Sequence, residues 1–293
     1  MYLVHYEGGC MLEVKNLDFG YGKQKLFQQL SLSVQTGQIV GLLGLNGAGK
    51  TSLLKLIAGA LYPQSGEIIL YGRSTLHRHP DVLADIYFVP EDPWGPALTP
   101  LAWLERYGVF RPAMNRALFY RLLEEFQVDK NKPISRMSYG QRKKCALAQA
   151  MASGSRLVLL DEPTNGLDIP SKAQFRRSLT MVDLQDTIFI ISTHQARDLE
   201  TVLDPILIIH EGSLLCSFPA AAINERFSVR SVEKLEGLPV IYAEQGALGY
   251  QALLAEGGSG ADLETLFTAA IQDPEAFRRA LEVESSRTIK ENL

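Results

Sequence analysis

A glycine-rich turn at residues 44–51 carries the residue types best suited to chemistry. It reads GLNGAGKT and fits the pattern G-x-x-x-x-G-K-[ST], in which successive backbone N–H groups converge on phosphate oxygens. Glycines permit that approach, because side chains would obstruct it or force a left-handed backbone that costs about 1–2 kcal/mol per residue. Lys50 offers a charge to the β- and γ-phosphates, and Thr51 offers a hydroxyl to Mg²⁺. The predicted nucleotide-binding residues of this turn are Gly44, Asn46, Gly47, Ala48, Gly49, Lys50, Thr51 and Ser52.

A pair of carboxylates follows a second apolar run. Asp161 and Glu162 come directly after residues 157–160 (LVLL), at the carboxyl end of a predicted buried strand, where open α/β sheets bind ligands. There Asp161 can hold Mg²⁺ through water, and Glu162 can polarise the water that attacks the γ-phosphate. The alternative is an ordinary surface turn. Beside a phosphate-binding turn, the pair predicts nucleotide hydrolysis.

Short apolar runs place both motifs in one sheet. Residues 38–43 predict the strand before the glycine turn, and residues 51–58 predict the helix after it. Residues 157–160 and 187–191 are equally apolar, as in parallel strands covered by helices on both faces. Residues 12–34 instead alternate apolar and polar side chains, which is typical of half-buried antiparallel strands. We therefore predict an α/β fold, a P-loop NTPase core with an antiparallel β subdomain.

Two further regions complete the predicted fold. Thr99 followed by Pro100 is typical of a helix start, and apolar residues recur at helical spacing after it, so we predict a helical insertion at about 92–135. The ATP-binding domain would then span 11–216, followed by a small C-terminal α+β appendage at 217–293. The appendage is predicted to contain a hairpin of strands 239–243 and 250–254 and helices 261–271 and 274–283, the second capped by Asp273. Its open roles are regulation, dimerisation, partner docking and covering of the sheet edge.

Composition excludes several classes of protein. The 293 residues are 46% hydrophobic and 21% charged, which argues against disorder, and the net charge of −4 lacks the basic excess typical of nucleic-acid binding. The N-terminus shows no signal-like pattern, and no run approaches the roughly 18 apolar residues of a membrane span. Cys10, Cys145 and Cys216 are too scattered for a disulfide framework, so we expect reduced thiols in a cytoplasmic protein.

A third motif gives the sequence a family resemblance. Residues 137–141 read MSYGQ, which is similar to the LSGGQ signature of ATP-binding cassette (ABC) proteins. Together with the motifs above, it makes residues 11–216 resemble the nucleotide-binding subunit of an ABC transporter. The resemblance implies that Ser138, Gly140 and Gln141 close on the γ-phosphate held by a second subunit. A serine-glycine loop that only caps a helix is the alternative.

Three other positions resemble family motifs. Residues 165–168 (NGLD) resemble the D-loop that communicates between the two nucleotide sites. His194, which follows the strand 187–191, resembles the switch histidine that contacts the γ-phosphate, and Tyr21 resembles the aromatic that stacks on adenine. The alternatives are a packed or solvated histidine and an ordinary aromatic at a strand end.

Two positions depart from the family pattern. Glu91 stands where the family usually has a glutamine that touches Mg²⁺, and a carboxylate can also bind Mg²⁺. It brings a like charge toward the γ-phosphate, worth about 4 kcal/mol for unit charges about 4 Å apart at an effective dielectric of about 20. We therefore hypothesise that Glu91 makes closure of the site more strictly Mg²⁺-dependent; a solvated loop carboxylate is the alternative. Tyr139 replaces a glycine, and its ring is expected to loosen dimer closure.

The resemblance implies an ATPase motor subunit. It would form a head-to-tail dimer with a second copy of itself or a homologous subunit around two Mg·ATP. It would drive a separately encoded permease from the cytoplasmic face of the membrane, with no nucleic acid as partner. The implied catalytic residues are Glu162 and His194. The implied Mg²⁺ ligands are Thr51, Asp161 and Glu91. Two alternatives stay open: a soluble ABC ATPase of DNA repair or translation, and a nucleotide-gated regulatory binder with weakened turnover.

Aromatic residues around the helical insertion are candidates for permease contact. Trp94, Trp103 and Phe110 lie in or beside this insertion and could line the groove that receives the membrane subunit. Such aromatics more often belong to the core.

Overall fold

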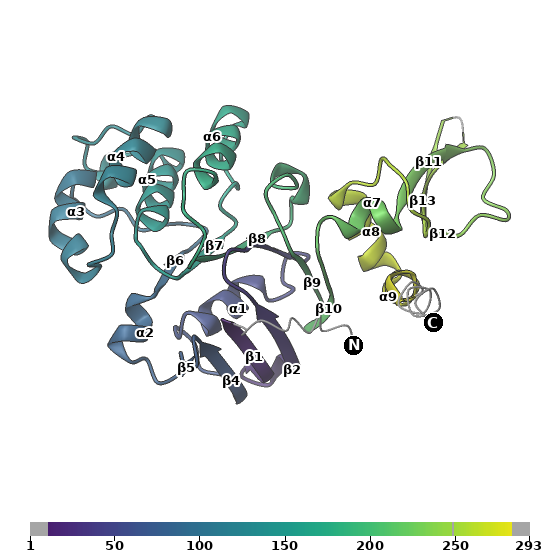
Figure 1. Ribbon diagram of the computed structural model, residues 1–293, viewed down its shortest axis with the longest axis horizontal. Helices are drawn as coiled ribbons and strands as arrows, with labels where there is room; N and C mark the ends of the chain where they lie inside the picture. The colour runs from purple at the N-terminus through teal and green to yellow at the C-terminus, as the bar shows by residue number, and fades with distance from the viewer. Residues whose placement is uncertain (1–10, 248, 283–293) are drawn as a thin grey trace.

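The computed structural model describes residues 11–247 and 249–282, and the strands in these ranges form three sheets (Figure 1). The largest sheet has the strand order β10-β9-β3-β8-β7-β6. Neighbouring strands from β9 to β6 are parallel, and β10 pairs antiparallel with β9 at the edge. The strands are β3 (Ile39–Leu43), β6 (Ile86–Val89), β7 (Leu157–Asp161), β8 (Ile188–Thr193), β9 (Ile206–His210) and β10 (Ser213–Phe218). The prediction of a parallel sheet is confirmed.

An antiparallel sheet packs on one side of α1 (Lys50–Ile57), and the large sheet packs on the other (Figure 1). Its strand order is β2-β1-β4-β5. These strands are β1 (Leu12–Tyr21), β2 (Gln24–Val34), β4 (Ser65–Leu70) and β5 (Arg73–Ser74). Buried side chains lie opposite each other on β1 and β2, for example Leu12 and Val34. They are buried because one face of this sheet packs on the core. The antiparallel layer predicted at 12–34 is confirmed.

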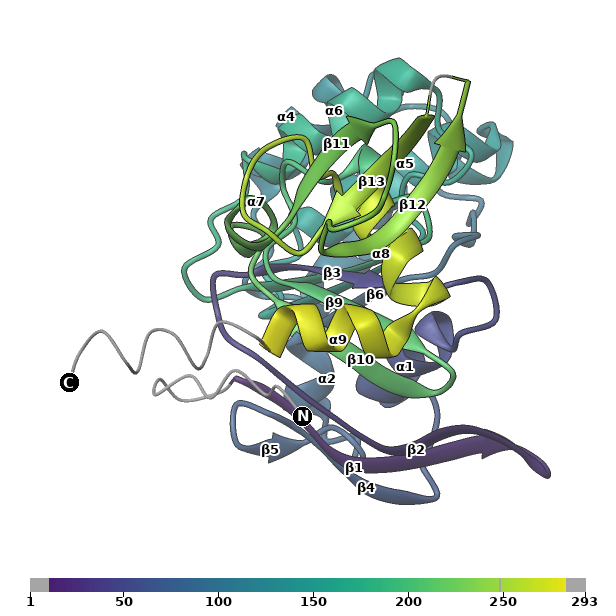
Figure 2. The same cartoon turned by 90° about the vertical axis from the view of Figure 1, so that its right-hand side faces the viewer.

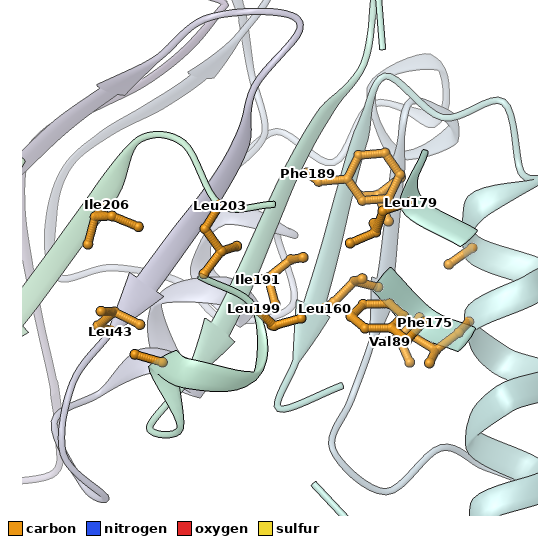
Figure 3. Close-up of a cluster of buried hydrophobic side chains, with 14 of the residues drawn as sticks. Leu43, Val89, Leu160, Phe175, Leu179, Phe189, Ile191, Leu199, Leu203 and Ile206 are labelled. Carbon is orange, nitrogen blue, oxygen red and sulfur yellow. The ribbon is translucent and has the colours of Figure 1, made fainter. Parts of the chain in front are cut away.

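Helices cover the opposite face of the large sheet (Figure 3). Along β7, Leu157 and Leu159 join the core around α1, whereas Val158 and Leu160 join the core beneath the helices. In Figure 3, Leu160 lies beside Phe175 of α6 (Ile169–Leu179). Both faces are buried, which explains why this strand is apolar without alternation.

The segment between β6 and β7 is mainly helical. Thr99 Oγ1 accepts a hydrogen bond from Ala102 N at 3.1 Å, so the helix predicted to begin after Thr99 is confirmed. Asn115 caps the next long helix in the same way, through Leu118 N at 2.9 Å. Between β6 and β7 the helices are α3 (Pro100–Tyr107), η1 (Gly108–Phe110), α4 (Arg116–Glu125), η2 (Ile134–Arg136) and α5 (Tyr139–Met151). Two further helices are α2 (Pro80–Ala84), before β6, and η3 (Ala196–Asp198), after β8.

The C-terminal part packs on the edge strand β10. Its elements are α7 (Ala222–Arg226), β11 (Ser228–Val232), β12 (Val240–Gly246), β13 (Gly249–Leu254), α8 (Leu263–Gln272) and α9 (Pro274–Glu282). Figure 2 shows α9 beside β10, where Arg278 Nε donates to Leu215 O at 3.2 Å. The rings of Phe227 and Phe277 stack with centroids 5.4 Å apart. The predicted hairpin and the helix cap at Asp273, which accepts from Ala276 N at 2.9 Å, are confirmed.

One strand of this region was not predicted. β11 pairs antiparallel with β13, so the sheet order is β11-β13-β12. Its sequence, SVRSV, is short and partly polar, so its intrinsic strand propensity is weak. Pairing with β13 stabilises it as a strand.

Two of the three cysteines lie in the described part of the chain. Cys145 and Cys216 are buried and unpaired, and burial raises the pKa of each thiol to about 12, so both stay protonated. Cys10 lies outside the described residues. Within the described part of the chain, every helix is too short or too polar to cross a membrane.

Candidate active site

The glycine turn joins β3 to α1 in the conformation that its sequence requires. Gly47 and Gly49 have φ values of +84° and +100°, in the left-handed region that other residues avoid. A Cβ at Gly49 would also come within 2.6 Å of the Phe27 ring. Gly44 is needed for space alone, since its φ is not left-handed and a Cβ there would lie 2.9 Å from the carbonyl oxygen of Ile209. The first residues of α1 line a cavity together with this turn.

This cavity has a volume of about 570 Å³ and opens beside the glycine turn. The side chains that line it come from β1, β2, the glycine turn, α1 and the loops after β6, β7 and β8. They include the predicted site residues Tyr21, Asn46, Gly47, Gly49, Lys50, Thr51, Ser52, Glu91, Glu162 and His194. The tertiary structure therefore gathers most of the candidate site, from positions up to 173 residues apart in the chain, at one end of the parallel sheet.

Asp161 does not line this cavity but is held directly behind Thr51, which does, by hydroxyl groups. Its carboxylate accepts hydrogen bonds from Thr51 Oγ1 at 2.8 and 3.0 Å and from Ser192 Oγ at 2.7 Å. The residue is only 2% exposed, and these bonds offset the cost of burying its charge. Ser192 was not predicted as a site residue, although the Ser192-Thr193-His194 run at the end of β8 could have indicated it.

The Glu162 carboxylate lies between Lys50 and His194. Its Oε1 lies 2.9 Å from His194 Nδ1 and 3.3 Å from Lys50 Nζ. Lys50 Nζ also donates to Gly44 O at 2.8 Å. Glu162 has a φ of +45°, a conformation that costs a non-glycine residue about 1–3 kcal/mol and is found at functional sites. The backbone strain turns this carboxylate toward the glycine turn.

Tyr21 and Glu91 lie at the rim of the cavity. The Tyr21 ring is 55% exposed and packs edge-on against Phe19, and its hydroxyl lies 3.1 Å from Ser52 Oγ. Glu91 is exposed, and its Oε1 accepts a hydrogen bond from Asn165 Nδ2 at 2.5 Å. Both positions leave a face free toward a molecule bound in the cavity.

The MSYGQ segment does not line this cavity. Ser138 is exposed and caps α5, accepting a hydrogen bond from Gln141 N at 3.3 Å. Gly140 is the second residue of the same helix. One chain alone therefore does not bring Ser138, Gly140 and Gln141 to its own phosphate-binding turn. Ala48 also lies outside the cavity lining, because its backbone folds back to donate to Leu45 O at 3.1 Å.

Tyr139 turns toward its own chain. Its hydroxyl donates to Glu91 O at 2.8 Å, and its ring lies over Gly166, where a Cβ would come within 2.6 Å of a ring carbon. Glycine at 166 makes room for the aromatic ring that replaces glycine at 139. The expectation of a ring that obstructs dimer closure rested on the missing glycine alone and did not foresee this packing.

The three candidate aromatics divide into two groups. Trp103 packs against the core, with ring centroids 6.3 Å from Phe119 and 5.9 Å from Tyr107. Trp94 and Phe110 are instead 75% and 72% exposed. The core explanation therefore holds for Trp103 and is wrong for the other two.

Known proteins match this chain over about 70–80% of its length. A family model described as ABC transporter matches residues 27–165. The chain is 31% identical over 220 residues to the bacitracin transport ATP-binding protein BcrA of Bacillus licheniformis, covering 74% of this chain and 72% of that protein. It is also 31% identical over 211 residues to the SkfA peptide export ATP-binding protein SkfE of Bacillus subtilis (strain 168), covering 70% of this chain and 87% of that protein. A solved structure described as an ATP-binding subunit of an ABC transporter matches with a TM-score of 0.66 and 26% identity, over 73% of this chain and 92% of that one.

Proposed function

Because this chain belongs to the ABC transporter family, as an ATP-binding subunit that hydrolyses ATP to drive transport, we propose that its glycine turn and the ends of β7 and β8 form the hydrolytic site. The observation that carries the proposal is the convergence of Lys50, Thr51, Glu162 and His194 on one cavity, with Asp161 hydrogen-bonded to Thr51 directly behind its lining. Each of these side chains has a distinct task in phosphoryl transfer.

Mg²⁺ fits the oxygen groups of Thr51, which lines the cavity, and of Asp161 behind it. Thr51 Oγ1 and the Asp161 carboxylate lie within hydrogen-bond distance, and hydroxyl and carboxylate oxygens are the ligands that Mg²⁺ prefers. Thr51 would bind the ion directly and Asp161 would hold it through water, with Glu91 a third candidate from the rim. Bound Mg²⁺ would neutralise charge on the β- and γ-phosphate oxygens.

The remaining residues bind the phosphates and move the proton. The amides of the glycine turn and the positive end of α1 would hold the β- and γ-phosphates. Lys50 would exchange its contacts with Gly44 O and Glu162 for phosphate oxygens. Glu162 would then be free to accept a proton from the attacking water, and His194 would contact the γ-phosphate and hold the Glu162 carboxylate in place.

A second subunit would complete the site. The exposed Ser138, at the start of α5, offers a hydroxyl and a helix N-terminus to a phosphate outside its own cavity. We therefore propose a head-to-tail dimer, with a second copy or a homologous subunit, in which each MSYGQ segment closes on the other subunit's ATP. A transmembrane permease would hold this dimer at the cytoplasmic face of the membrane.

The carboxylate at position 91 predicts an unusual dependence on Mg²⁺. In Glu91→Gln, the ratio of ATP dissociation constants without and with Mg²⁺ is expected to fall by up to about 5-fold, since exposed charge pairs contribute about 0.2–1 kcal/mol. The amide keeps the size of the side chain and can still bond to Asn165. Titration calorimetry with ATP, in the presence of Mg²⁺ and of EDTA, measures both constants. An unchanged ratio would remove the proposed role of Glu91.

The exposed side chains of Trp94 and Phe110 are the proposed contact with the permease. Truncating either exposed aromatic to alanine is expected to weaken permease binding by about 5- to 30-fold, because buried aromatic anchors contribute about 1–2 kcal/mol each. Basal ATP hydrolysis of the subunit alone should stay unchanged. Tyr62→Ala, which removes another exposed aromatic outside the helical segment, is the matched control. The measurement is copurification and permease-stimulated ATPase activity in detergent; equal results for all three variants would exclude this surface.

A further inference from the structure

Lys143 is a buried cation directly behind Glu162, the proposed catalytic base. It lies on α5, one turn after Tyr139, and its side chain is 0% exposed. Its Nζ donates to Glu162 O at 2.6 Å, to Asn165 O at 3.0 Å and to Tyr139 Oη at 3.2 Å. Among the described residues, no carboxylate oxygen lies within ion-pair distance of this ammonium. All three of its protons therefore go to the turn after β7 and to the MSYGQ segment.

Burial of a lysine ammonium destabilises the folded state unless its contacts offset the lost hydration. Removing an ammonium from water costs several kcal/mol, and hydrogen bonds to neutral oxygens recover part of it. An apolar side chain would fill the same space without that cost. At this position the hydrogen bonds to the turn and the charges of nearby carboxylates, Glu162 and Glu91 among them, favour the ammonium, so its contacts with the turn are where its role is sought.

The turn that Lys143 contacts contains Glu162, whose backbone conformation is strained. Glu162 has a φ of +45°, and such a conformation persists only where its surroundings fix it on both sides. On one side, Glu162 N donates to Ser192 O and Ser192 Oγ, both at 3.1 Å. On the other side, the Glu162 carbonyl oxygen accepts from Lys143 Nζ at 2.6 Å and from Asn165 N at 3.2 Å. Lys143 is thus the side-chain part of the clamp that holds the Glu162 backbone in this conformation.

The same ammonium reaches the segment that would serve the other subunit. Tyr139 Oη accepts from Lys143 and donates to Glu91 O, and Asn165 Nδ2 donates to Glu91 Oε1. We propose that Lys143 is a positioning residue for ATP hydrolysis, which fixes the Glu162–Asn165 turn and connects it to the MSYGQ segment of the same chain. This inference rests on the proposed role of Glu162 as the acceptor of the water proton.

The test compares three substitutions on one helix. Methionine and glutamine are matched in length at position 143, but only glutamine can donate hydrogen bonds. Lys144→Met is the matched control, because the Lys144 ammonium is also buried but contacts Ser171 and Gln174 on α6. In Lys143→Met, kcat for ATP hydrolysis is expected to fall by about 10-fold or more, because small misplacements of a reacting group are costly. KM for ATP should stay within about 3-fold, Lys143→Gln should be intermediate, and Lys144→Met should match the wild type.

Hydrogen exchange provides a readout that does not depend on turnover. Amides of residues 162–166 are expected to exchange faster in Lys143→Met than in Lys144→Met, at comparable melting temperatures of the two variants. Equal kcat and equal exchange in these two variants would overturn the proposal. Glu162→Gln, assayed in parallel, separates the two hypotheses. Ordinary turnover in Glu162→Gln would refute the role of Glu162 as the base. Slow turnover in Glu162→Gln together with wild-type kcat and exchange in Lys143→Met would refute the role of Lys143 alone.

Discussion

Glu162→Gln is expected to lower kcat for ATP hydrolysis by about 10²–10⁴-fold while ATP binding is retained. Glutamine has the size of glutamate, so the contacts of this side chain with His194 and Lys50 keep their geometry. An amide cannot accept the proton of the attacking water. The phosphate-binding amides and Lys50 are not altered, so the chemical step is lost and the binding step is kept.

The same variant should accumulate as an ATP-bound dimer, because the step that releases the two subunits is blocked. Size-exclusion chromatography with light scattering, with and without Mg·ATP, measures this. Adding Ser138→Glu to Glu162→Gln places a like charge beside the partner's γ-phosphate and should abolish the dimer. Ser138 is exposed and its hydroxyl caps α5, so the expected loss of stability is about 1 kcal/mol and the fold is retained. Ordinary turnover in Glu162→Gln would move the base to another residue, and a dimer that survives Ser138→Glu would contradict the head-to-tail arrangement.

Lys50→Ala is expected to weaken ATP binding itself by about 10- to 150-fold. This range corresponds to about 1.5–3 kcal/mol, the contribution of a hydrogen bond to a charged group. Lys50 is 6% exposed and has its ammonium between Gly44 O and Glu162, next to the place where the phosphates would lie. Titration calorimetry or a fluorescent ATP analogue gives the dissociation constant.

Lys55→Ala is the matched control for this measurement. It removes a lysine from the last turn of the same helix, away from the cavity. The control should bind ATP as the wild type does. Normal affinity in Lys50→Ala would exclude the phosphate role of Lys50, and equal losses in both variants would point to a general effect on α1.

The family and its ATPase function were predictable because they depend on short contiguous motifs. The glycine turn needs its residues within eight positions, and its strand and helix are adjacent in the chain, so local spacing describes the geometry almost completely. The relatives confirm the prediction of an ATP-binding subunit that drives transport, rather than a nucleotide-gated binder or a repair or translation ATPase.

Contacts between distant segments were not predictable in the same way. Ser192 meets Asp161 across two neighbouring strands, and Lys143 meets Glu162 and Asn165 from a helix that packs behind them. A lysine in a helix is usually solvated, and no spacing rule distinguishes the buried Lys143 from an exposed one. The strand β11 was missed because its pairing with β13 stabilises it more than its own sequence does.

The amino-acid sequence alone determined the nucleotide chemistry, the parallel and antiparallel sheets and the family, because these follow from local backbone geometry and from the periodicity of apolar residues. Only the tertiary structure decided where Tyr139 points, which aromatics are exposed and what holds Glu162 in a strained conformation. These features depend on which distant side chains and carbonyl groups come within a few ångströms of each other. Burial and hydrogen bonding there are set by packing between elements, which leaves no periodic trace in the chain.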